Sequence, residues 1–402
     1  MSYTLDYHFT EEVAKHLEET CNVNNFSKEN EDKYLVSYNK LKCDVKSNIY
    51  TLGLHRSLIF LNGNLVCFSP PKSLPFDVFR NKYPNISENN IIIEEFIEGT
   101  MINVFYNNVS HNWEIATKNN IGATNNFHKN SIYSFADLFY DTCRNISLNL
   151  ENSLNKKYCY SFVIKHPHNP MVEIVTQSML YLIEVYEIKN TSDSTIEIYV
   201  KNRNEIANQL SINWDIKVPM QFHYDTYDDI FSVRLLPSND HHYIRRCISM
   251  GYIIKNATTN ERTKLRNPEY EYLHRLKGNQ YDFLYQYLVL KQSKKIKEYL
   301  QYFPENSMLL DFYDIVVRSF TNKLYFYYHA VHITKVLILS EIPHYYKQLV
   351  YNLHGLYISQ KKDDPSFKIT KKYAIDYVNN LHPSLLFSKI SHHKSEMEND
   401  SI

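Results

Sequence analysis

The chain has 402 residues and a formal net charge of zero, with 44 Lys and Arg residues against 44 Asp and Glu residues. This length exceeds one typical domain and suits two. The neutral balance excludes a protein that holds nucleic acid by a global positive field, so any nucleic-acid partner requires a local basic patch.

The sequence predicts an intracellular, cytoplasmic protein with reduced thiols. Its first residues, MSYTLDYHFTEEVAKHLEE, carry acids where a signal peptide has a basic end and an apolar run. No apolar stretch approaches the ~20 residues of a membrane span. The six cysteines occur singly, without the CxxC spacing of a zinc or redox centre. We therefore expect no membrane association and no metal held by the protein.

The first part of the chain, residues 34–125, is rich in predicted strands and hairpins. Apolar runs on both sides of the Asn-Gly-Asn turn at 62–64 predict a hairpin. Residues 75–83 have the composition of a short helix. Two further strands are expected over residues 90–108 and 111–123, joined by an Asn-rich turn.

The middle of the chain mixes helices and strands. Helical spacing is found over residues 135–146 and 202–212, and strand patterns over 158–166 and 178–188. Two more strands are expected between residues 247 and 267. This alternation indicates that the mixed region extends to about residue 268.

From about residue 269 the apolar residues recur with a 3.6-residue period, which predicts a run of helices. The predicted organisation is a mixed domain over 1–268, a helical domain over 269–390 and a flexible polar tail over 391–402. The fold class is therefore expected to be α+β, with antiparallel sheets and flanking helices followed by an all-helical C-terminal domain.

Six segments of distinctive composition follow one another in the mixed region. They are HRSLIF at 55–60, EEFIEGTMINVF at 94–105, WEIATKNNIGA at 113–123, YCYSFVIKHPHNPMV at 158–172, SMGYIIKN at 249–256 and ERTKLRN at 261–267. Together they resemble the ordered motifs of phage-type RNA ligases of the tRNA-repair kind, which belong to the covalent nucleotidyltransferase superfamily. The resemblance covers roughly residues 34–268. It implies an ATP-grasp-like RNA/DNA ligase domain, ATP and Mg²⁺ as cofactors, and a nucleotide or RNA as partner.

The composition and one segment also bear on the source of the chain. Tyrosine is abundant at 35 residues, and Asn, Lys and Ile are frequent, which is typical of an AT-rich coding genome. The segment EEFIEGTMIN resembles segments in proteins of large DNA viruses. From these two observations we expect a virus-encoded protein.

The resemblance assigns roles to individual residues. Arg56 falls where the family has its phosphate-binding arginine, and the guanidinium fork suits a phosphate group. Glu98 and Gly99 match the acid and glycine of the nucleophile motif. Lys118 falls where the family has a basic residue in its nucleotide pocket. Each also has an ordinary interpretation, as a strand-end cation or a hairpin turn.

The last motif places two cations on alternate positions of one strand, so that both side chains point to the same face. These are Lys264 and Arg266, which the family's pattern aims at the phosphates; a solvated strand face is the alternative. We predict catalytic roles for Glu98, Lys118 and Lys264, and nucleotide or phosphate binding for Arg56, Gly99 and Arg266.

Four sites depart from the family's pattern, and at one of them Asn169-Pro170 stands where the family has an Asn-Arg pair. Phe96 stands where the nucleophilic lysine belongs, and Ser161 and Met250 stand where two carboxylates belong. Ligation needs a neutral lysine amine that attacks phosphorus, and phenylalanine offers no such atom. Without the two carboxylates, the predicted metal ligands are also missing.

Three functions fit this inventory. The first is an RNA-ligase-like protein that binds nucleotide or RNA ends and is catalytically degenerate. The second is an active ATP-dependent RNA ligase, working in RNA repair, whose nucleophile has moved, with Lys118 as the nearest replacement. The third is a structural or interaction protein that uses the ligase fold as a scaffold.

Other polar clusters have weaker signals. His166 and His168, and the pair at 241–242, lack a partner set at metal-ligand spacing, and we expect ordinary histidines there. The basic run at 291–297 lies among tyrosines and could bind RNA, but a solvated helix face is the preferred interpretation.

Overall fold

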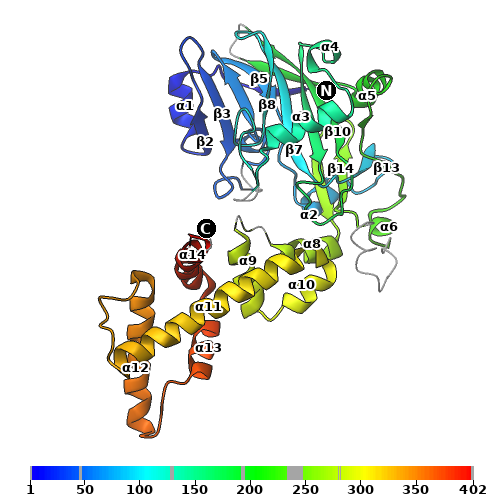
Figure 1. Cartoon of the computed structure of the whole chain (residues 1–402). Coiled ribbons are helices and arrows are strands. Elements are labelled where there is room, and N and C mark those ends of the chain that lie inside the picture. The colour runs from blue at the N-terminus through cyan, green and yellow to red at the C-terminus, as the bar shows by residue number, and fades with distance from the viewer. Residues whose placement is uncertain are drawn as a thin grey trace. The chain divides into compact units, whose positions relative to one another are not determined.

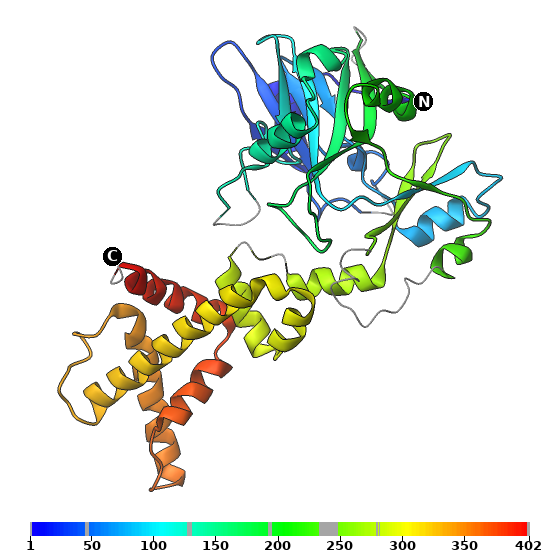
Figure 2. The same cartoon turned by 45° about the vertical axis from the view of Figure 1, so that its right-hand side comes forward.

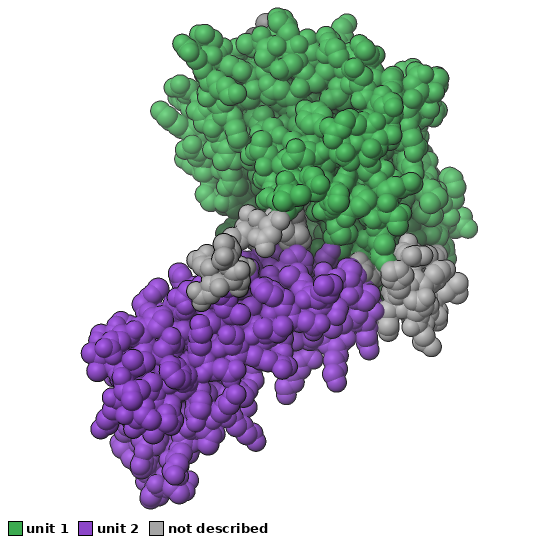
Figure 3. All heavy atoms as spheres, viewed as in Figure 1, with its two compact units in different colours: residues 1–274 green, residues 275–402 purple. Residues whose placement is uncertain are grey.

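The computed structural model describes residues 2–44, 48–126, 131–191, 195–232, 248–278, 280 and 282–399. The chain divides into two compact units, Met1–His274 and Arg275–Ile402 (Figure 3). The division falls inside α8 (Pro268–Lys277), slightly beyond residue 268, where we expected the boundary.

Three sheets form the first unit (Figure 1). The largest has the order β1-β11-β10-β9-β7-β8, with β12 beside β10. Its strands are β1 (Ser2–Leu5), β7 (Thr100–Asn107), β8 (Asn112–Ala116), β9 (Tyr158–Lys165), β10 (Met179–Asn190), β11 (Ile196–Val200) and β12 (Ile216–Lys217). All its pairings are antiparallel except that of β12 with β10.

Two four-stranded sheets complete the strands described in this unit. One is β2-β3-β4-β5, made of β2 (Cys21–Asn25), β3 (Lys33–Tyr38), β4 (Leu58–Leu61) and β5 (Asn64–Phe68). The other is β13-β6-β14-β15, made of β6 (Ile91–Glu95), β13 (Gln221–Phe222), β14 (Gly251–Asn256) and β15 (Arg262–Arg266). The predicted hairpin is confirmed as β4-β5, with positive φ at Asn62 and Gly63, the backbone that such tight turns require.

Helices cover the sheets of the first unit. They are α1 (Glu11–Leu17), η1 (Leu52–Leu54), α2 (Phe76–Lys82), α3 (Phe135–Asn145), α4 (Leu150–Ser153), α5 (Arg203–Ser211) and α6 (Tyr227–Ser232). Helix α3 begins with a capping box, in which Ser134 and Asp137 satisfy each other's backbone N–H groups. Helices α3 and α5 both pack on β10, and α3 also packs on β9. Strand β5 packs against β7, β9 and β10. Helix α2 packs on β15 in the other sheet (Figure 2).

One predicted strand is divided between two sheets. We expected a continuous strand over 90–108, but β6 lies in the four-stranded sheet and β7 in the seven-stranded sheet. The chain crosses between them at Gly99, where φ is +144°. A Cβ atom there would lie 2.3 Å from the carbonyl oxygen of Ile164. Only glycine permits this close approach, so the glycine of the motif serves a strand crossing.

The second unit is helical. Its helices are α9 (Phe283–Gln292), α10 (Ile296–Tyr302), η2 (Pro304–Asn306), α11 (Ser307–His332), α12 (His344–Asp363), α13 (Lys371–Asn380) and α14 (Pro383–Asn399). The long helix α11 is central and packs on α9, α12, α13 and α14. Leu310, Val317 and Leu324, one heptad apart, bury the same face of α11.

The predicted flexible tail is wrong for residues 391–399, because α14 continues to Asn399. Leu386, Ile390 and His393 are spaced i, i+4 and i+7 and are all buried. The His393 ring contacts the hydroxyl of Tyr346, with Nδ1 3.3 Å from Oη. A polar-looking segment is therefore an amphipathic helix whose buried face includes a histidine.

The predicted fold class is confirmed: an α+β unit of mostly antiparallel sheets precedes a helical C-terminal unit. In the described part of the chain, no helix has the length and apolar character needed to cross a membrane.

Candidate phosphate-binding site

A small cavity of about 70 Å³ lies in the first unit, lined by residues of two sheets. Strands β6, β14 and β15 contribute charged side chains, and β7, β9 and β10 contribute apolar ones. The charged lining consists of Arg56, Lys255, Arg262, Lys264, Glu94 and Glu95, and Phe96 lies among them. Cations outnumber carboxylates at this lining, so the cavity is electrostatically suited to an anion.

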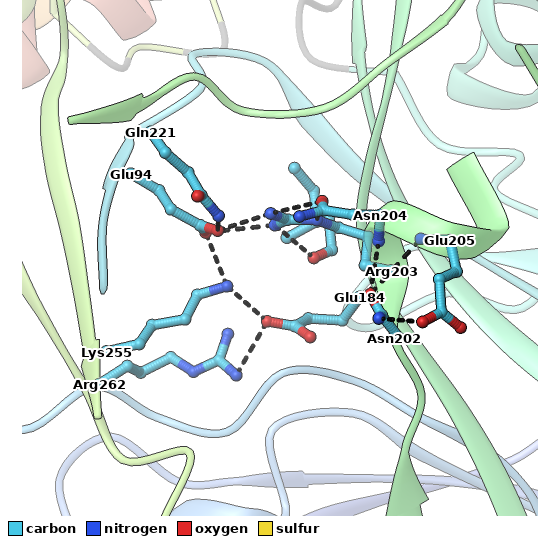
Figure 4. Close-up of polar contacts among 10 residues, drawn as sticks. Glu94, Glu184, Asn202, Arg203, Asn204, Glu205, Gln221, Lys255 and Arg262 are labelled. Carbon is cyan, nitrogen blue, oxygen red and sulfur yellow. Dashed lines mark hydrogen bonds and ion pairs between the residues drawn. The ribbon is translucent and has the colours of Figure 1, made fainter. Parts of the chain in front are cut away.

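Part of this charge is balanced by a buried ion-pair network (Figure 4). Lys255 Nζ lies 2.7 Å from a carboxylate oxygen of Glu94 and 2.7 Å from one of Glu184. Arg203 Nη2 lies 2.5 Å from Glu94, and Arg262 Nη2 lies 3.2 Å from Glu184. All five side chains are buried, and the network ties β6, β10, β14, β15 and α5 together.

The pKa values of the two acids follow from these pairs. Burial alone raises the pKa of Glu94, but Lys255 and Arg203 overcome it and lower the pKa to about 2. Burial likewise opposes ionisation of Glu184, and Lys255 and Arg262 hold its pKa below the usual value. Both carboxylates are therefore ionised and engaged, which is the pattern of a structural network.

A second group of cations has no such balance. Among the described residues, Arg56, Lys118 and Lys264 have no ion pair with a carboxylate. Arg56 makes one long hydrogen bond, from Nη1 to the carbonyl oxygen of Pro70 at 3.5 Å. Lys264 Nζ lies 4.8 Å from the ring centroid of Phe96, and Lys118 Nζ lies 4.5 Å from that of Tyr38.

The pKa values of these cations show that they act on one another. Burial lowers the pKa of Lys264 to about 7, and the charge of Arg56 adds to the shift. Burial lowers the pKa of Lys118 to about 8, again with a contribution from Arg56. Burial also lowers the pKa of Arg56 itself. Cations that repel one another in a site partly withdrawn from water are stabilised in their charged form by an anion placed among them.

Two further polar groups of the cavity lining point to a ligand. The hydroxyl of Ser73 is buried and has no hydrogen-bond partner in the described part of the chain. The same holds for Nε of Arg262, a side chain that is 5% exposed. Buried donors in native proteins are nearly always satisfied, so the cavity has donors available to an acceptor-rich ligand.

The structure engages Glu98 and Arg266 elsewhere. Glu98 is buried and accepts hydrogen bonds from the backbone N–H groups of Val172 at 3.0 Å and Glu173 at 3.1 Å. Burial raises its pKa. Arg266 is exposed, and its Nη1 lies 2.6 Å from a carboxylate oxygen of Glu271. The cavity lining includes neither Glu98, Gly99, Lys118 nor Arg266.

The structure shows the surroundings of two positions that depart from the family's pattern, Ser161 and Met250. The Ser161 hydroxyl donates to Asn103 Oδ1 at 2.8 Å, and both side chains are buried. The cross-strand neighbour of Ser161 on β10 is Glu184, so a carboxylate is present beside the position that lacks one. Met250 precedes Gly251, whose carbonyl oxygen accepts from the Phe96 N–H at 2.9 Å.

The ion-pair network was not predicted from the sequence. Its members were visible only as isolated charges in otherwise apolar strands, such as Glu94 after three isoleucines and Glu184 between Ile183 and Val185. A charge in a buried strand needs a partner, and that rule could have flagged them. The partners come from strands that are distant in sequence, so their identity depended on the sheet order.

The described residues do not fit a metal ion held by the protein. They contain no group of three or more His, Cys, Asp or Glu side chains arranged as ligands. Glu94 and Glu184 are paired with cations, and Glu98 is bound to backbone N–H groups. His166 pairs with Asp141 at 3.0 Å, and the histidine pair at 241–242 lies outside the described residues.

The basic run at 291–297 lies in the second unit. Lys291 Nζ is 2.8 Å from Asp314 and also contacts the Tyr287 hydroxyl. At least this lysine of the run is therefore neutralised within the protein.

No family model matches the chain, and no curated protein matches its sequence. Solved structures do resemble it. One is an RNA ligase from Naegleria gruberi (13% identity, 53% of this chain and 60% of that chain, TM-score 0.36). Another is a provisionally assigned ATP-dependent DNA ligase from Aquifex aeolicus (12%, 81% and 78%, TM-score 0.43). A third is an archaeal ATP-dependent RNA ligase (8%, 76% and 70%, TM-score 0.40).

The match spans about 60% of the length of the Naegleria ligase. At these identities and scores the similarities assign no family and no activity to this chain. The side chains around the cavity, and not these similarities, support the proposal that follows.

Proposed function

We propose that the first unit binds a phosphorylated ligand, a nucleotide or the phosphorylated end of an RNA, with a phosphate group of that ligand in the cavity beside Arg56 and Lys264. The observation that carries the proposal is the unbalanced charge. Arg56, Lys118 and Lys264 lack carboxylate partners among the described residues. Each is also partly withdrawn from water, and a bound anion would stabilise its charged form.

Phosphate suits the site better than a carboxylate ligand. A guanidinium at Arg56 presents a fork of donors that matches phosphate oxygens. Ser73 Oγ and Arg262 Nε add two donors that have no protein acceptor in the described structure. Phosphate, with three or four acceptor oxygens, can use several of these groups at once.

Phe96 has no nucleophilic atom, so the position at which the ligase pattern has its lysine contributes no chemistry. The proposal therefore concerns binding alone. A structural or interaction protein on the same scaffold is the competing function, and it predicts no affinity for phosphorylated ligands.

Titration of the full chain with ATP, pyrophosphate and a short 5′-phosphorylated RNA tests the proposal. We expect measurable affinity that weakens as salt rises, because phosphate binding is electrostatic, and no affinity for adenosine, which lacks phosphate. The double variant R56M/K264M should bind at least about tenfold more weakly, the effect of losing one or more charge-assisted hydrogen bonds.

The matched control is Arg80→Met, which removes an arginine of the same unit that pairs with Asp228 at the surface. This variant should bind as the parent does. No affinity for any of the three ligands at low salt would leave the interaction protein as the better account.

A further inference from the structure

The loop that follows β9, residues 166–173, is fixed at both of its ends. At its start, the buried His166 pairs with Asp141 of α3, with Nε2 3.0 Å from Oδ2. At its end, Glu173 pairs with Lys165, with a carboxylate oxygen 2.6 Å from Nζ. The residues between these two ion pairs are therefore held in place on the surface of the first unit.

This loop presents the exposed ring of His168. The ring stacks on Tyr133, with the centroids 4.7 Å and the planes 22° apart, and Tyr133 is 37% exposed. The backbone N–H of His168 donates to His166 Nδ1 at 3.1 Å, which fixes the backbone beneath the ring. Tyr133 is fixed as well, because Ser134 caps helix α3 directly after it. Two aromatic rings are thus held together at the surface.

The stacked pair lines a cavity of about 330 Å³, a volume within the range of pockets for small molecules. Ile132 and Leu138 add apolar lining. Its polar lining consists of Asp137, Asp141, Arg144 and His166. We call this the aromatic cavity, and the one beside Arg56 and Lys264 the phosphate cavity. Aromatic rings with polar groups beside them suit a flat ligand with hydrogen-bonding edges, such as a nucleobase.

The charge of the aromatic cavity differs from that of the phosphate cavity. Asp137 and Asp141 are two carboxylates against one guanidinium, that of Arg144. Hydrogen bonds from Ser134 lower the pKa of Asp137, and the hydrogen bond from His166 lowers that of Asp141, so both acids are ionised at neutral pH. A phosphate would be repelled here. A base is uncharged, and its donors and acceptors can pair with carboxylate and guanidinium groups.

The two cavities lie on opposite faces of the seven-stranded sheet. Val163 of β9 lines the phosphate cavity. Phe162 and Ile164 point to the other face, where they pack with residues of α3, and His166 lies on that face because it pairs with Asp141. A mononucleotide with its phosphate in the phosphate cavity cannot place its base in the aromatic cavity, because the sheet lies between them.

We propose that the aromatic cavity holds an unpaired base of an RNA strand whose phosphorylated end lies in the phosphate cavity. This inference rests on the proposed function, and it narrows the ligand to an RNA longer than one nucleotide. The base stacks on the exposed rings of Tyr133 and His168, as unpaired bases do on aromatic side chains. Arg144 and Asp137 bind its edge.

Titration of the full chain with a 5′-phosphorylated single-stranded RNA of about 12 nucleotides, and in parallel with pyrophosphate, tests the inference. Tyr133→Leu and His168→Ala should each weaken RNA binding at least about fivefold, the effect of losing one stacked base. Both variants should bind pyrophosphate as the parent does. The matched control is Tyr140→Leu, since Tyr140 of α3 is 39% exposed and does not line the cavity; it should bind the RNA normally.

Photo-cross-linking gives a second measurement that does not depend on affinity. The same RNA with 5-iodouridine at one internal position after another should cross-link to Tyr133 or His168 from at least one of these positions.

The outcomes separate this inference from the function on which it rests. Unchanged RNA affinity in both variants, or cross-links only to other parts of the chain, overturns the base-binding role; pyrophosphate binding would still support the proposed function. An equal loss of RNA and pyrophosphate affinity in the variants also contradicts a separate base site. A chain that binds neither the RNA nor pyrophosphate removes both proposals.

Discussion

Two groups of cations line one cavity of the first unit, yet they differ in what surrounds them. Lys255 and Arg262 face Glu94 and Glu184 at ion-pair distance. Arg56 and Lys264 face each other and have no acid within ion-pair distance in the described part of the chain. The residue types are the same in both groups. The partners decide which group stabilises the fold and which is available to a ligand.

The largest expected effect comes from breaking the balanced group. Glu184→Gln removes the charge that faces both Lys255 and Arg262 and leaves two buried cations poorly compensated. The free energy of unfolding should fall by about 3–5 kcal/mol. Tryptophan fluorescence during urea unfolding can report this change selectively, because both tryptophans of the chain, Trp113 and Trp214, lie in the first unit.

The control for this measurement is an exposed pair. Arg80→Met removes the surface partner of Asp228 and should change the free energy of unfolding by no more than about 1 kcal/mol. If Glu184→Gln unfolds at the same urea concentration as this control, the network does not stabilise the fold.

Removing Arg56 or Lys264, the two lining cations without a carboxylate partner in the described part of the chain, should weaken ligand binding and not the stability of the fold. Arg56→Met, of similar volume, should leave the free energy of unfolding unchanged or higher, since a half-buried charge without a carboxylate partner is lost. The same variant should bind ATP at least about tenfold more weakly, for the loss of a charge-assisted hydrogen bond. A large loss of stability with unchanged affinity would place Arg56 in the structural group.

A smaller effect is expected in the pH dependence of stability. Lys264 and Lys118 have pKa values of about 7 and about 8 in the folded chain, whereas an unfolded lysine titrates near 10.4. Between about pH 7 and pH 10 the unfolded chain therefore binds more protons, and the free energy of unfolding should rise with pH. Affinity for phosphate should fall over the same range, because the amines lose their charge.

Urea unfolding of the parent and of Lys264→Met at pH 7, 8 and 9 checks this slope. The rise with pH should be shallower in the variant, because one of the two shifted amines is gone. An identical slope in both proteins would show that Lys264 titrates normally.

The smallest effect is expected at Arg266. Its guanidinium is paired with Glu271 at 2.6 Å and is exposed, and Arg266 does not line the cavity. Arg266→Met should change ATP affinity by less than about threefold, in the range of a surface ion pair. A tenfold loss of ATP affinity, measured by calorimetric titration, would show that Arg266 takes part in ligand binding.

Local patterns in the sequence predicted much of the fold. The β4-β5 hairpin followed from its Asn-Gly turn, α3 from its apolar spacing, and the helical second unit from a 3.6-residue period. The split between β6 and β7 was not predicted, because strand-forming residues continue on both sides of Glu98 and Gly99. What divides it is the contact of Gly99 with Ile164 on β9, which depends on tertiary structure.

The site was predicted less completely. Sequence order singled out Arg56 and Lys264, and the structure brings both to one cavity; their roles in binding stay predictions. The network around Glu184 was missed because it joins strands β6, β10, β14 and β15, which come from separate parts of the chain. Pairing of isolated charges cannot be deduced until the order of strands is known.

The hydrogen bonds of Glu98 affect how mutants of this chain should be interpreted. Its carboxylate secures the backbone of Val172 and Glu173, so an alanine at this position would release the loop that follows β9. A loss of activity in such a mutant could be mistaken for the loss of a catalytic acid, although its cause would be a misfolded loop. A carboxylate at this position can therefore serve the fold alone, and its presence does not by itself identify an enzyme.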